Sequence, residues 1–487
     1  MSTLKSLFKH TFVYGLATVL PRLLTMLLTP LYVAYLEDPA AFGKVTEVFA
    51  FIMILNVLLT YGMETAFFRF YSDAKYGLKA LSTALISLLV TTFLAAMLSY
   101  AGIVSIAEWT EVAVQYWKWV IAVIALDTLT VIPFAYLRAQ KKSMKYALIK
   151  LLNVVISVGL ATFFLVFLPQ VDVINQWLPQ DEIELVFIAF FIASLVMFVI
   201  MSPAYFRKWE FDKSLWRKMA IYGIPILIAG IAFAINESID KILLPRLLPE
   251  DVGETQLGIY AACYRLSVGM TLFATAFKLG VEPFFFSESK NSNANQMYAQ
   301  ITKVFVVLGS VFLLAYIVLV DIIKPILIPK EVYWEAMHIV PLILIAYLFF
   351  GIYQTLSVWY KVTDQTKYGA YISVVGAILT IVVNIALIPR IGYLASAIAT
   401  LGAYGLMMVI SYLMGRKHLE IPYDIKNLVL YVGVSVAFSC VFFYYLRDYF
   451  GIGSWQLYLV GTLMTVVLIG VIVIREKALI RSLLRRT

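Results

Sequence analysis

The chain has few of the residues on which most enzyme sites depend. Its 487 residues include two cysteines and three histidines, and only 14% are charged. Cys263 and Cys440 fall in apolar stretches far apart in the sequence, which favours two buried thiols over a disulfide or a metal site. The histidines are scattered, and the sequence has no HExxH, P-loop or GxSxG pattern. We therefore expect no enzyme, no metal and no other cofactor.

Apolar residues are abundant instead. They make up 62% of the chain, and the mean hydropathy is +0.90, whereas soluble domains are roughly 45–50% apolar. Apolar runs of about 20 residues, the length of a helix that crosses a bilayer, recur along the chain. The sequence therefore predicts an all-α polytopic membrane protein with about 14 transmembrane helices. We place them at about 11–36, 41–69, 77–103, 112–138, 143–169, 185–206, 216–241, 255–286, 297–320, 335–360, 368–390, 393–414, 424–446 and 452–475.

The distribution of basic residues predicts the orientation. An even number of spans places both termini on one side of the membrane. Of 38 lysines and arginines, the joints on the opposite side carry only Lys241, Arg246, Lys324, Lys330, Arg390 and Arg447. Because basic residues resist translocation, both termini are predicted to be cytoplasmic. The net charge of +9 then reflects topology and contact with anionic lipids, and no nucleic-acid partner is expected.

The two halves of the chain repeat a motif. The predicted second span ends with Gly62-Met-Glu64-Thr-Ala-Phe67-Phe68, and the eighth ends with Gly280-Val-Glu282-Pro-Phe-Phe285-Phe286. The same sidedness in both copies predicts two parallel six-helix bundles, in 1–210 and 211–415, with a cleft between them. Residues 416–487 would add two helices and a basic cytoplasmic tail.

A second motif carries a family resemblance. Asn384-Ile-Ala-Leu-Ile-Pro389-Arg-Ile-Gly392, followed by Ala397-Ile-Ala-Thr400, resembles a stretch of bacterial polysaccharide flippases of the O-antigen type. The Gly62 to Tyr71 stretch, which ends Arg69-Phe70-Tyr71, resembles those proteins too. They belong to the multidrug/oligosaccharidyl-lipid/polysaccharide (MOP) exporter superfamily.

The resemblance implies a V-shaped core that alternates between two open states in the bacterial cytoplasmic (inner) membrane. It implies transfer of an undecaprenyl-diphosphate-linked oligosaccharide to the outer leaflet, for lipopolysaccharide or other surface polysaccharide. The implied partners are that lipid-linked oligosaccharide, membrane lipids, and a polysaccharide polymerase and ligase of the same pathway. Related lipid II flippases bind the diphosphate with arginines of the first, second and eighth spans, for which Arg22 and Arg265 are the candidates here, with Lys44 in the second span.

The residues themselves also single out charges at the membrane midplane. A charge there costs roughly 2.5–3.5 kcal/mol, so each needs a partner or a function. Arg22, Arg265 and Asp127 have no opposite charge three or four residues away. At 1.5 Å per residue they lie about 14–16 Å from the ends of their spans, near the middle of a core about 30 Å thick. One reading is a buried bridge between Asp127 and an arginine. The other is that the arginines bind a diphosphate and Asp127 serves a coupling ion.

The repeated motif and three prolines give candidates for conformational change. Glu64 and Glu282 lie near cytoplasmic helix ends, so the motif is either an inner gate or a packing motif. Pro21, Pro30 and Pro225 interrupt predicted spans, as hinges or as plain kinks.

Three other functions remain open. A cation-coupled multidrug exporter shares the fold, but its cationic substrates favour an acidic cavity. A lipid II (peptidoglycan precursor) flippase would share the chemistry with another sugar. A membrane-embedded glycosyltransferase or ligase needs larger loops and a cluster of catalytic carboxylates, which the sequence lacks.

Overall fold

The protein is helical throughout the part that the structure describes. The computed structural model describes residues 20, 23–24, 26–73, 75–170, 178–206, 209–287, 293–363 and 365–477, and no strand occurs among them. Twelve helices in these ranges are long and apolar enough to cross a membrane. Val252–Leu266 and Val268–Val281, which meet at 43°, make a thirteenth if they form one span. The predicted all-α polytopic membrane protein is confirmed. The first predicted span, 11–36, lies partly outside the described residues, so the number of about 14 stays a prediction.

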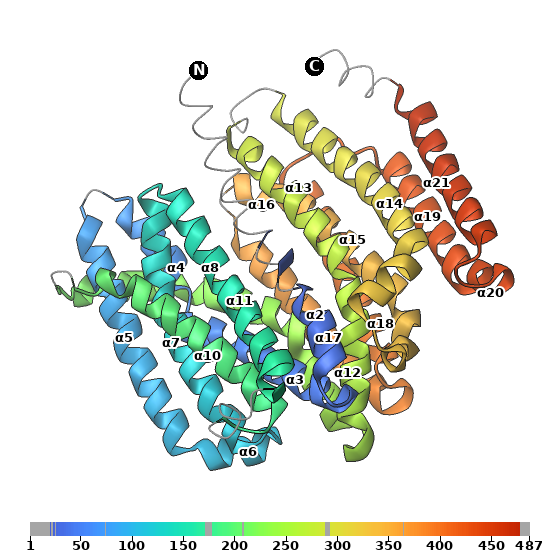
Figure 1. The fold of residues 1–487 in the computed structure, drawn as a ribbon. Helices are drawn as coiled ribbons and strands as arrows, with labels where there is room; N and C mark the ends of the chain where they lie inside the picture. Colours follow the sequence, from blue (N-terminus) through green and yellow to red (C-terminus); the bar gives the residue numbers. More distant parts are fainter. Residues whose placement is uncertain are drawn as a thin grey trace. The chain divides into compact units, whose positions relative to one another are not determined.

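Contacts divide the chain into two compact units. The first unit lies within Met1–Ala261 and Ser373–Ser396, and the second within Ala262–Ile372 and Ala397–Thr487. The first unit (Figure 1) holds α2 (Leu28–Tyr35), α3 (Pro39–Thr60), α4 (Met63–Tyr71), α5 (Gly77–Ala101), α6 (Ile103–Thr110), α7 (Val114–Ala139), α8 (Ser143–Thr162), η1 (Phe163–Phe167), η2 (Leu168–Gln170), α10 (Glu182–Met201), η3 (Ser202–Ala204), α11 (Lys213–Leu247) and most of α12 (Glu250–Leu266) and α17 (Lys367–Ile391). The second unit holds α13 (Val268–Ser287), α14 (Ala294–Leu327), η4 (Glu331–Ile339), α15 (Val340–Leu356), α16 (Val358–Val362), most of α18 (Leu394–His418), α19 (Ile425–Val441), η5 (Phe442–Leu446), α20 (Arg447–Phe450) and α21 (Trp455–Arg475). The predicted boundaries at 210 and 415 stay a prediction.

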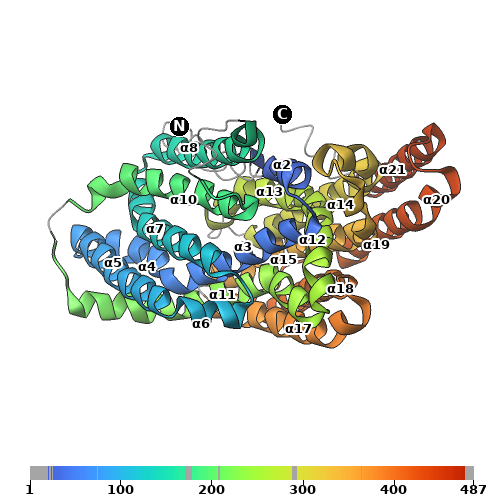
Figure 2. The same cartoon turned by 60° about the horizontal axis from the view of Figure 1, so that its bottom comes forward.

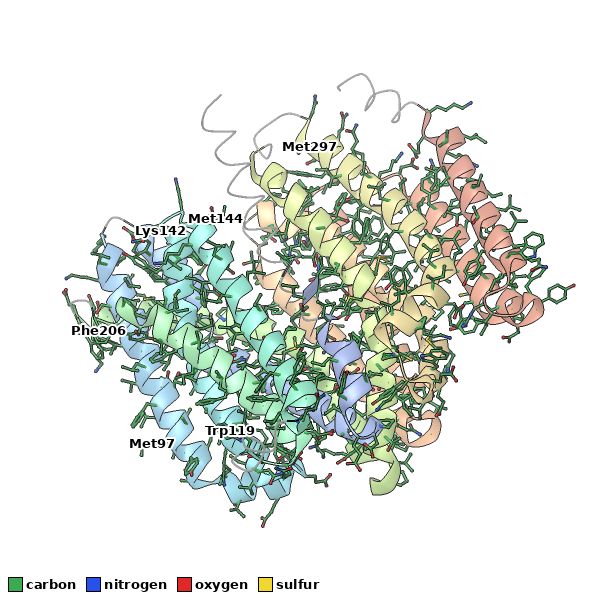
Figure 3. The ribbon with its side chains drawn as sticks, viewed as in Figure 1. Met97, Trp119, Lys142, Met144, Phe206 and Met297 are labelled. Carbon is green, nitrogen blue, oxygen red and sulfur yellow. The ribbon has the colours of Figure 1, made fainter. Side chains whose placement is uncertain are left out.

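Apolar side chains cover the outside of the helices. Met97 of α5 and Phe206, after η3, are 56% and 86% exposed and lie on the surface of the first unit (Figure 3). By contrast, the span that contains α15 is 83% buried. A helix that is apolar on its exposed face suits a hydrocarbon solvent, so this surface is the one expected to contact lipid.

Long helices pack side by side in the first unit. α7 packs against α5 and α10, and α11 packs against α3 (Figure 2). Hydrogen bonds reinforce the apolar contacts: Trp216 Nε1 of α11 donates to Ser87 Oγ of α5 at 2.7 Å, and the Tyr61 hydroxyl lies 2.7 Å from the same oxygen. In a hydrocarbon environment such polar groups are stable only when paired within the protein.

A break between α3 and α4 places the first copy of the repeated motif. Tyr61 and Gly62 have φ of 32° and 72°, so α3 ends here and α4 begins, and the two helices together form one candidate span, Pro39–Tyr71, in agreement with the span predicted over 41–69. A Cβ on Gly223 of α11 would lie 2.7 Å from the Tyr61 carbonyl oxygen, and one on Gly62 would lie 2.5 Å from the Gly223 carbonyl oxygen. Gly62 is thus required both by its backbone conformation and by the close approach of α11.

Helices α19 and α21 are fixed to α14 near one of its ends by a charged cluster. Lys303 Nζ of α14 lies 2.9 Å from Asp424 Oδ2 and 3.0 Å from Glu476 Oε1, at the start of α19 and the end of α21. The Tyr431 hydroxyl donates to Glu476 at 2.8 Å. One lysine therefore joins three helices.

A second cluster fixes α20, which follows α19 and η5 without a break, near the other end of α14. Arg447 of α20 donates through Nε and a terminal nitrogen to the two oxygens of Asp321, both at 2.8 Å. The two side chains are only 9% and 3% exposed. Lys324 lies 3.5 Å from Asp321 and over the Trp334 ring. We call the Lys303 and Asp321 clusters the two α14 clamps.

Candidate functional site

A cluster of four charged residues joins α3, α11 and α12 in the first unit. Glu47, whose side chain is 1% exposed, accepts Lys44 Nζ at 3.1 Å and an Arg246 guanidinium nitrogen at 2.7 Å. Lys44 also pairs with Glu254, and Arg246 donates to the Thr110 carbonyl oxygen. We call Lys44, Glu47, Arg246 and Glu254 the α3–α12 cluster. It links residues of the predicted first bundle to residues of the predicted second.

The backbones of α3 and α12 touch beside this cluster. A Cβ on Gly43 would collide with the Glu254 carbonyl oxygen, and one on Gly258 would collide with the Pro39 carbonyl oxygen. No side chain fits at either position without moving a helix. Glycine at both positions allows the helices to approach closely enough for the α3–α12 cluster to form.

The two copies of GxExxFF have different surroundings. In the first copy, Glu64 forms an ion pair with Arg138 of α7, whose guanidinium lies 4.8 Å from the centre of the Phe68 ring. In the second copy, Gly280 lies within α13, and a Cβ there would meet no described atom within 4 Å. The side chain of Glu282 lies outside the described residues. The repeat is therefore real in sequence, but its glycine meets a packing requirement only in the first copy.

Asp127 lies inside the first unit between three helices. Ser194 Oγ of α10 donates to Asp127 Oδ1 at 2.7 Å, and Lys150 of α8 acts on it by charge. Lys150 Nζ lies 4.3 Å from the centre of the Phe134 ring. Among the described residues, the hydrogen-bond partner found for Asp127 is thus the Ser194 hydroxyl, and no ion pair with an arginine is found.

The remaining predicted residues are only partly described. Pro21 and Arg22 lie outside the described residues. Arg265 is half-buried near the end of α12, just before the bend at Ser267. Pro30 lies inside the short helix α2, and Pro225 lies within α11, which continues past it.

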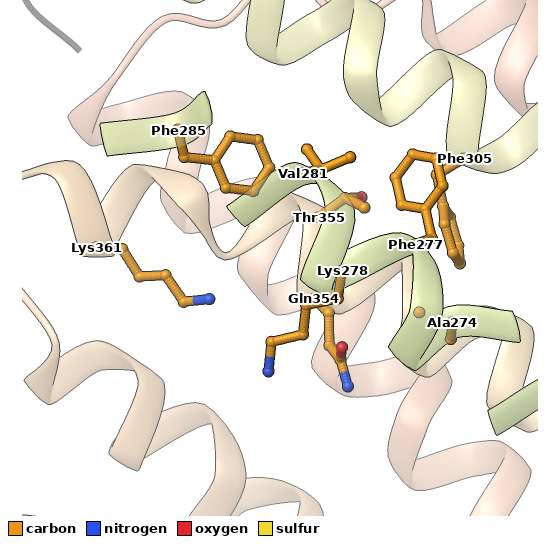
Figure 4. Close-up of a pocket in the computed structure, with 10 residues that line it drawn as sticks. Ala274, Phe277, Lys278, Val281, Phe285, Phe305, Gln354, Thr355 and Lys361 are labelled. Atoms are coloured by element: carbon orange, nitrogen blue, oxygen red, sulfur yellow. The ribbon is translucent and has the colours of Figure 1, made fainter. Parts of the chain in front are cut away.

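The second unit contains a pocket with two lysines. It is lined by Lys278 of α13, Gln354 of α15 and Lys361 of α16, together with Phe277, Phe285 and Phe305. Figure 4 shows the polar ends of Lys278, Gln354 and Lys361 reaching toward one side of the pocket, away from the Phe285 and Phe305 rings. Gln354 Oε1 is buried and has no hydrogen-bond partner in the described part of the chain. The two cations suit an anionic group, whereas the orphan Gln354 oxygen is an acceptor and suits a hydroxyl or other donor. Sequence spacing paired Lys278 with Glu282 and did not connect it to Lys361.

The Asn384 motif forms a buried polar network in the first unit. Thr380 Oγ1 donates to Asn236 Oδ1 at 2.9 Å, Asn384 Nδ2 to the Thr380 carbonyl oxygen at 2.7 Å, and Ser396 Oγ to Asn384 Oδ1 at 2.8 Å. All four side chains are buried. The motif therefore fastens α17 to α11 and to the start of α18.

Comparisons with known proteins agree on the fold. The family model described as "Polysaccharide biosynthesis protein" matches residues 7–287, and the model "MatE" matches residues 225–386. A solved structure described as lipid II flippase MurJ in an inward closed conformation is similar, with a TM-score of 0.74 and 18% identity over 96% of this chain and all of that one.

Two transporters are similar over slightly less of the chain. An inward-facing multidrug resistance MATE family transporter of the MOP superfamily has a TM-score of 0.63 and 12% identity over 86% of this chain and 95% of its own. A MOP superfamily transporter from Pyrococcus furiosus, whose binding pocket is described as of reverse polarity, has a TM-score of 0.58 and 14% identity over 85% of this chain and 95% of its own. No curated protein sequence matches this chain.

Proposed function

Because the chain belongs to the polysaccharide biosynthesis protein family and is a multi-pass transporter of the MOP superfamily, not an enzyme, we propose that its cargo is an undecaprenyl-diphosphate-linked oligosaccharide. The protein would carry this lipid from the cytoplasmic to the outer leaflet of a bacterial inner membrane, with both termini cytoplasmic. The glycan would then pass to the polymerase and ligase of a lipopolysaccharide or similar pathway.

The family match over residues 7–287 is the observation that carries this proposal, and the lysine pocket of the second unit suggests where charges of the cargo would bind. Lys278 and Lys361 would bind anionic groups of the cargo from outside the pocket, whose enclosed volume of ≈ 10 Å³ holds about one water molecule. Arg22 and Arg265 are proposed to bind the diphosphate, since a guanidinium offers paired donors to phosphate oxygens. Asp127 is proposed to serve charge balance or a coupling ion, together with its neighbour Lys150.

Alternating access requires contacts that form and break. We assign the α3–α12 cluster to the closed outer gate, because it joins the two predicted bundles at the end where α3 begins and α11 ends. Glu64 and Glu282 remain the proposed inner gate, and Pro21, Pro30 and Pro225 the proposed hinges. The predicted V-shaped cleft between two parallel bundles belongs to the same proposal.

The membrane potential favours this direction of transport. A diphosphate with about two negative charges is stabilised by roughly 4–5 kcal/mol per 100 mV when it moves outward, because an inside-negative potential drives anions out. Export therefore needs no nucleotide.

The test is a flipping assay in liposomes. A fluorescent undecaprenyl-diphosphate oligosaccharide is offered to the wild type and to Arg22→Ala, Arg265→Ala and the double variant Lys278→Gln/Lys361→Gln. Each variant is expected to slow flipping by about tenfold or more, since a hydrogen bond to a charged group contributes about 1.5–3 kcal/mol. Lys426→Gln, an exposed lysine at the start of α19, is the control and should flip like the wild type.

Two other cargoes have specific support. The MatE match over 225–386 favours an exported organic cation, and the likeness to MurJ favours lipid II. The same liposomes, loaded with an organic cation or with fluorescent lipid II, separate the three. Efflux of the cation with no lipid movement would replace our proposal with drug export, and movement of lipid II alone would narrow it to peptidoglycan synthesis.

A further inference from the structure

A polar hollow lies at one end of the second unit, where α14 begins and α18 ends. Its volume is ≈ 660 Å³, and its walls are Asn295 and Gln296 of α14, Tyr412 and Arg416 of α18, and the segment 419–423 that follows α18. This hollow is separate from the lysine pocket, with which it shares no residue. Its size is within the range of small-molecule sites.

Two opposite charges face this hollow without pairing. Arg416 and Glu420 both line it and are both exposed, four residues apart. In the described part of the chain, neither side chain forms an ion pair or a hydrogen bond. Residues at this spacing on a helix normally meet, but α18 ends at His418, before Glu420. The guanidinium and the carboxylate are thus both available to a ligand.

The rest of the wall is fixed in place. Asn295 Nδ2 of α14 donates to the Glu420 carbonyl oxygen at 3.0 Å, which holds the backbone of Glu420 to α14 rather than to α18. The rings of Tyr412 and Tyr423 contact each other, with centroids 6.2 Å apart. The hollow therefore exists as a shaped site with a cation and an anion at separate positions.

The location of the hollow indicates what reaches it. Helices α14 and α18 are both long and apolar enough to span the membrane. The hollow lies where α14 begins, at Ala294, and where α18 ends, at His418. Helix ends of this kind lie at the level of the lipid headgroups, where tyrosine and basic residues gather. Phospholipid headgroups are therefore present at high local concentration beside the hollow.

We propose that this hollow binds the phosphoethanolamine headgroup of a membrane phospholipid. Arg416 engages the phosphate, for which its fork of donors is suited, and Glu420 accepts from the primary ammonium. A choline headgroup has no N–H to donate to Glu420, and a glycerol headgroup has no cation at all. The bound lipid is a site-bound membrane component rather than cargo, so this inference does not depend on the proposed function.

The test is lipid binding by the full chain in detergent. Three short-chain lipids are titrated: dihexanoyl phosphatidylethanolamine and the matching phosphatidylcholine and phosphatidylglycerol. Glycerophosphoethanolamine and inorganic phosphate are titrated as water-soluble ligands. The wild type is expected to bind the ethanolamine lipid about tenfold more tightly than the choline or glycerol lipid, as one charged hydrogen bond implies. Phosphate alone should bind more weakly than either soluble or lipid phosphoethanolamine.

Variants test whether Arg416 binds the phosphate and Glu420 binds the ammonium group. Arg416→Gln should weaken binding of all three lipids about tenfold, whereas Glu420→Gln should abolish the preference for the ethanolamine lipid over the choline lipid. Lys417→Gln, an exposed neighbour that does not line the hollow, is the matched control. All three positions are exposed. The melting temperature of each variant without lipid, compared with that of the wild type, verifies that it is folded. Equal affinity for the ethanolamine and choline lipids, tighter binding of the glycerol lipid, phosphate that binds as well as the lipid, or variants that bind like the control would each overturn the proposal.

Discussion

Two sets of buried ion pairs hold the protein together, and they differ in what they join. The α14 clamps tie the continuous α19–α20 run to a single neighbouring helix at two separate points, and α21 at one of them. The α3–α12 cluster has Glu47 at its centre, draws on helices from both predicted bundles, and ends at Glu254, which is 38% exposed. A contact with two widely spaced anchors resists separation, whereas one compact cluster can release in a single step. We therefore expect the clamps to persist through transport and the cluster to open.

Cross-linking gives the largest expected difference between the α3–α12 cluster and the α14 clamps. In a chain with Cys263 and Cys440 replaced by alanine, Lys44→Cys/Glu254→Cys joined by a short reducible bis-maleimide should stop flipping, because α3 and α12 can no longer part. Flipping should return to its uncross-linked rate when the linker is cleaved. The readout is the liposome assay.

The matched pair is Lys303→Cys/Glu476→Cys with the same linker, at one α14 clamp. Here flipping should continue after cross-linking. Unchanged flipping in the cross-linked Lys44→Cys/Glu254→Cys variant would contradict a gating role for the α3–α12 cluster, and loss of flipping at the clamp would contradict its permanence.

Removal of Arg447 should have the largest effect on stability. Arg447→Met leaves the buried Asp321 without its bidentate partner, and the loss of one member of a buried pair typically costs about 3–5 kcal/mol. The melting temperature in detergent should fall clearly below that of the wild type, while Lys426→Met should not change it. If Arg447→Met melts like the control, Lys324 alone neutralises Asp321.

The two motif glycines should differ in their tolerance of alanine. Gly62→Ala forces a side chain into a left-handed conformation, at about 1–2 kcal/mol, and also against the Gly223 backbone. Gly280→Ala adds a methyl group within a helix where no described atom lies nearby, and should stabilise by about 0.5–1 kcal/mol. The melting temperatures of the two variants should therefore shift in opposite directions. Equal losses would mean that the two copies have the same environment after all.

The smallest expected effect is on the thermal stability of the protein at acidic pH. The hydrogen bond from Lys303 holds the pKa of the Asp424 carboxyl below its ordinary value. Because the pKa is lower in the folded protein, this contact stabilises above the ordinary carboxyl pKa of about 3.9 and is lost as the pH falls through the folded pKa. The melting difference between the wild type and Asp424→Asn should thus stay constant from about pH 8 to 5 and shrink below about pH 4. A difference that grows on acidification would reverse the sign of this linkage.

The sequence predicted the helices better than their contacts. Hydropathy located the spans because apolar runs report on the bilayer directly, but it gave no sign of the breaks within 41–69 and 255–286. The positive φ at Tyr61 and the 43° bend at Ser267 depend on backbone conformation inside apolar runs, which hydropathy does not register.

The candidate site was predictable only where partners are local. The pair Lys44 and Glu47 follows from helical spacing, whereas Arg246 and Glu254 approach Glu47 and Lys44 from other helices and leave no periodic signal. The same reason explains why the sequence did not connect Lys361 with Lys278, or Lys150 with Asp127. Charges within spans mark residues that need a partner, but the identity of a partner on another helix depends on the fold.

The glycines at 43 and 258 give experimental access to a rare state. A single methyl group at Gly258 would act as a wedge between α3 and α12, since it has no room beside the Pro39 carbonyl oxygen. Such a variant would shift the population away from the conformation described here without touching any charge or any cargo contact. It would therefore be the variant of choice for trapping the opposite conformation for imaging, and for raising binders that recognise only that conformation.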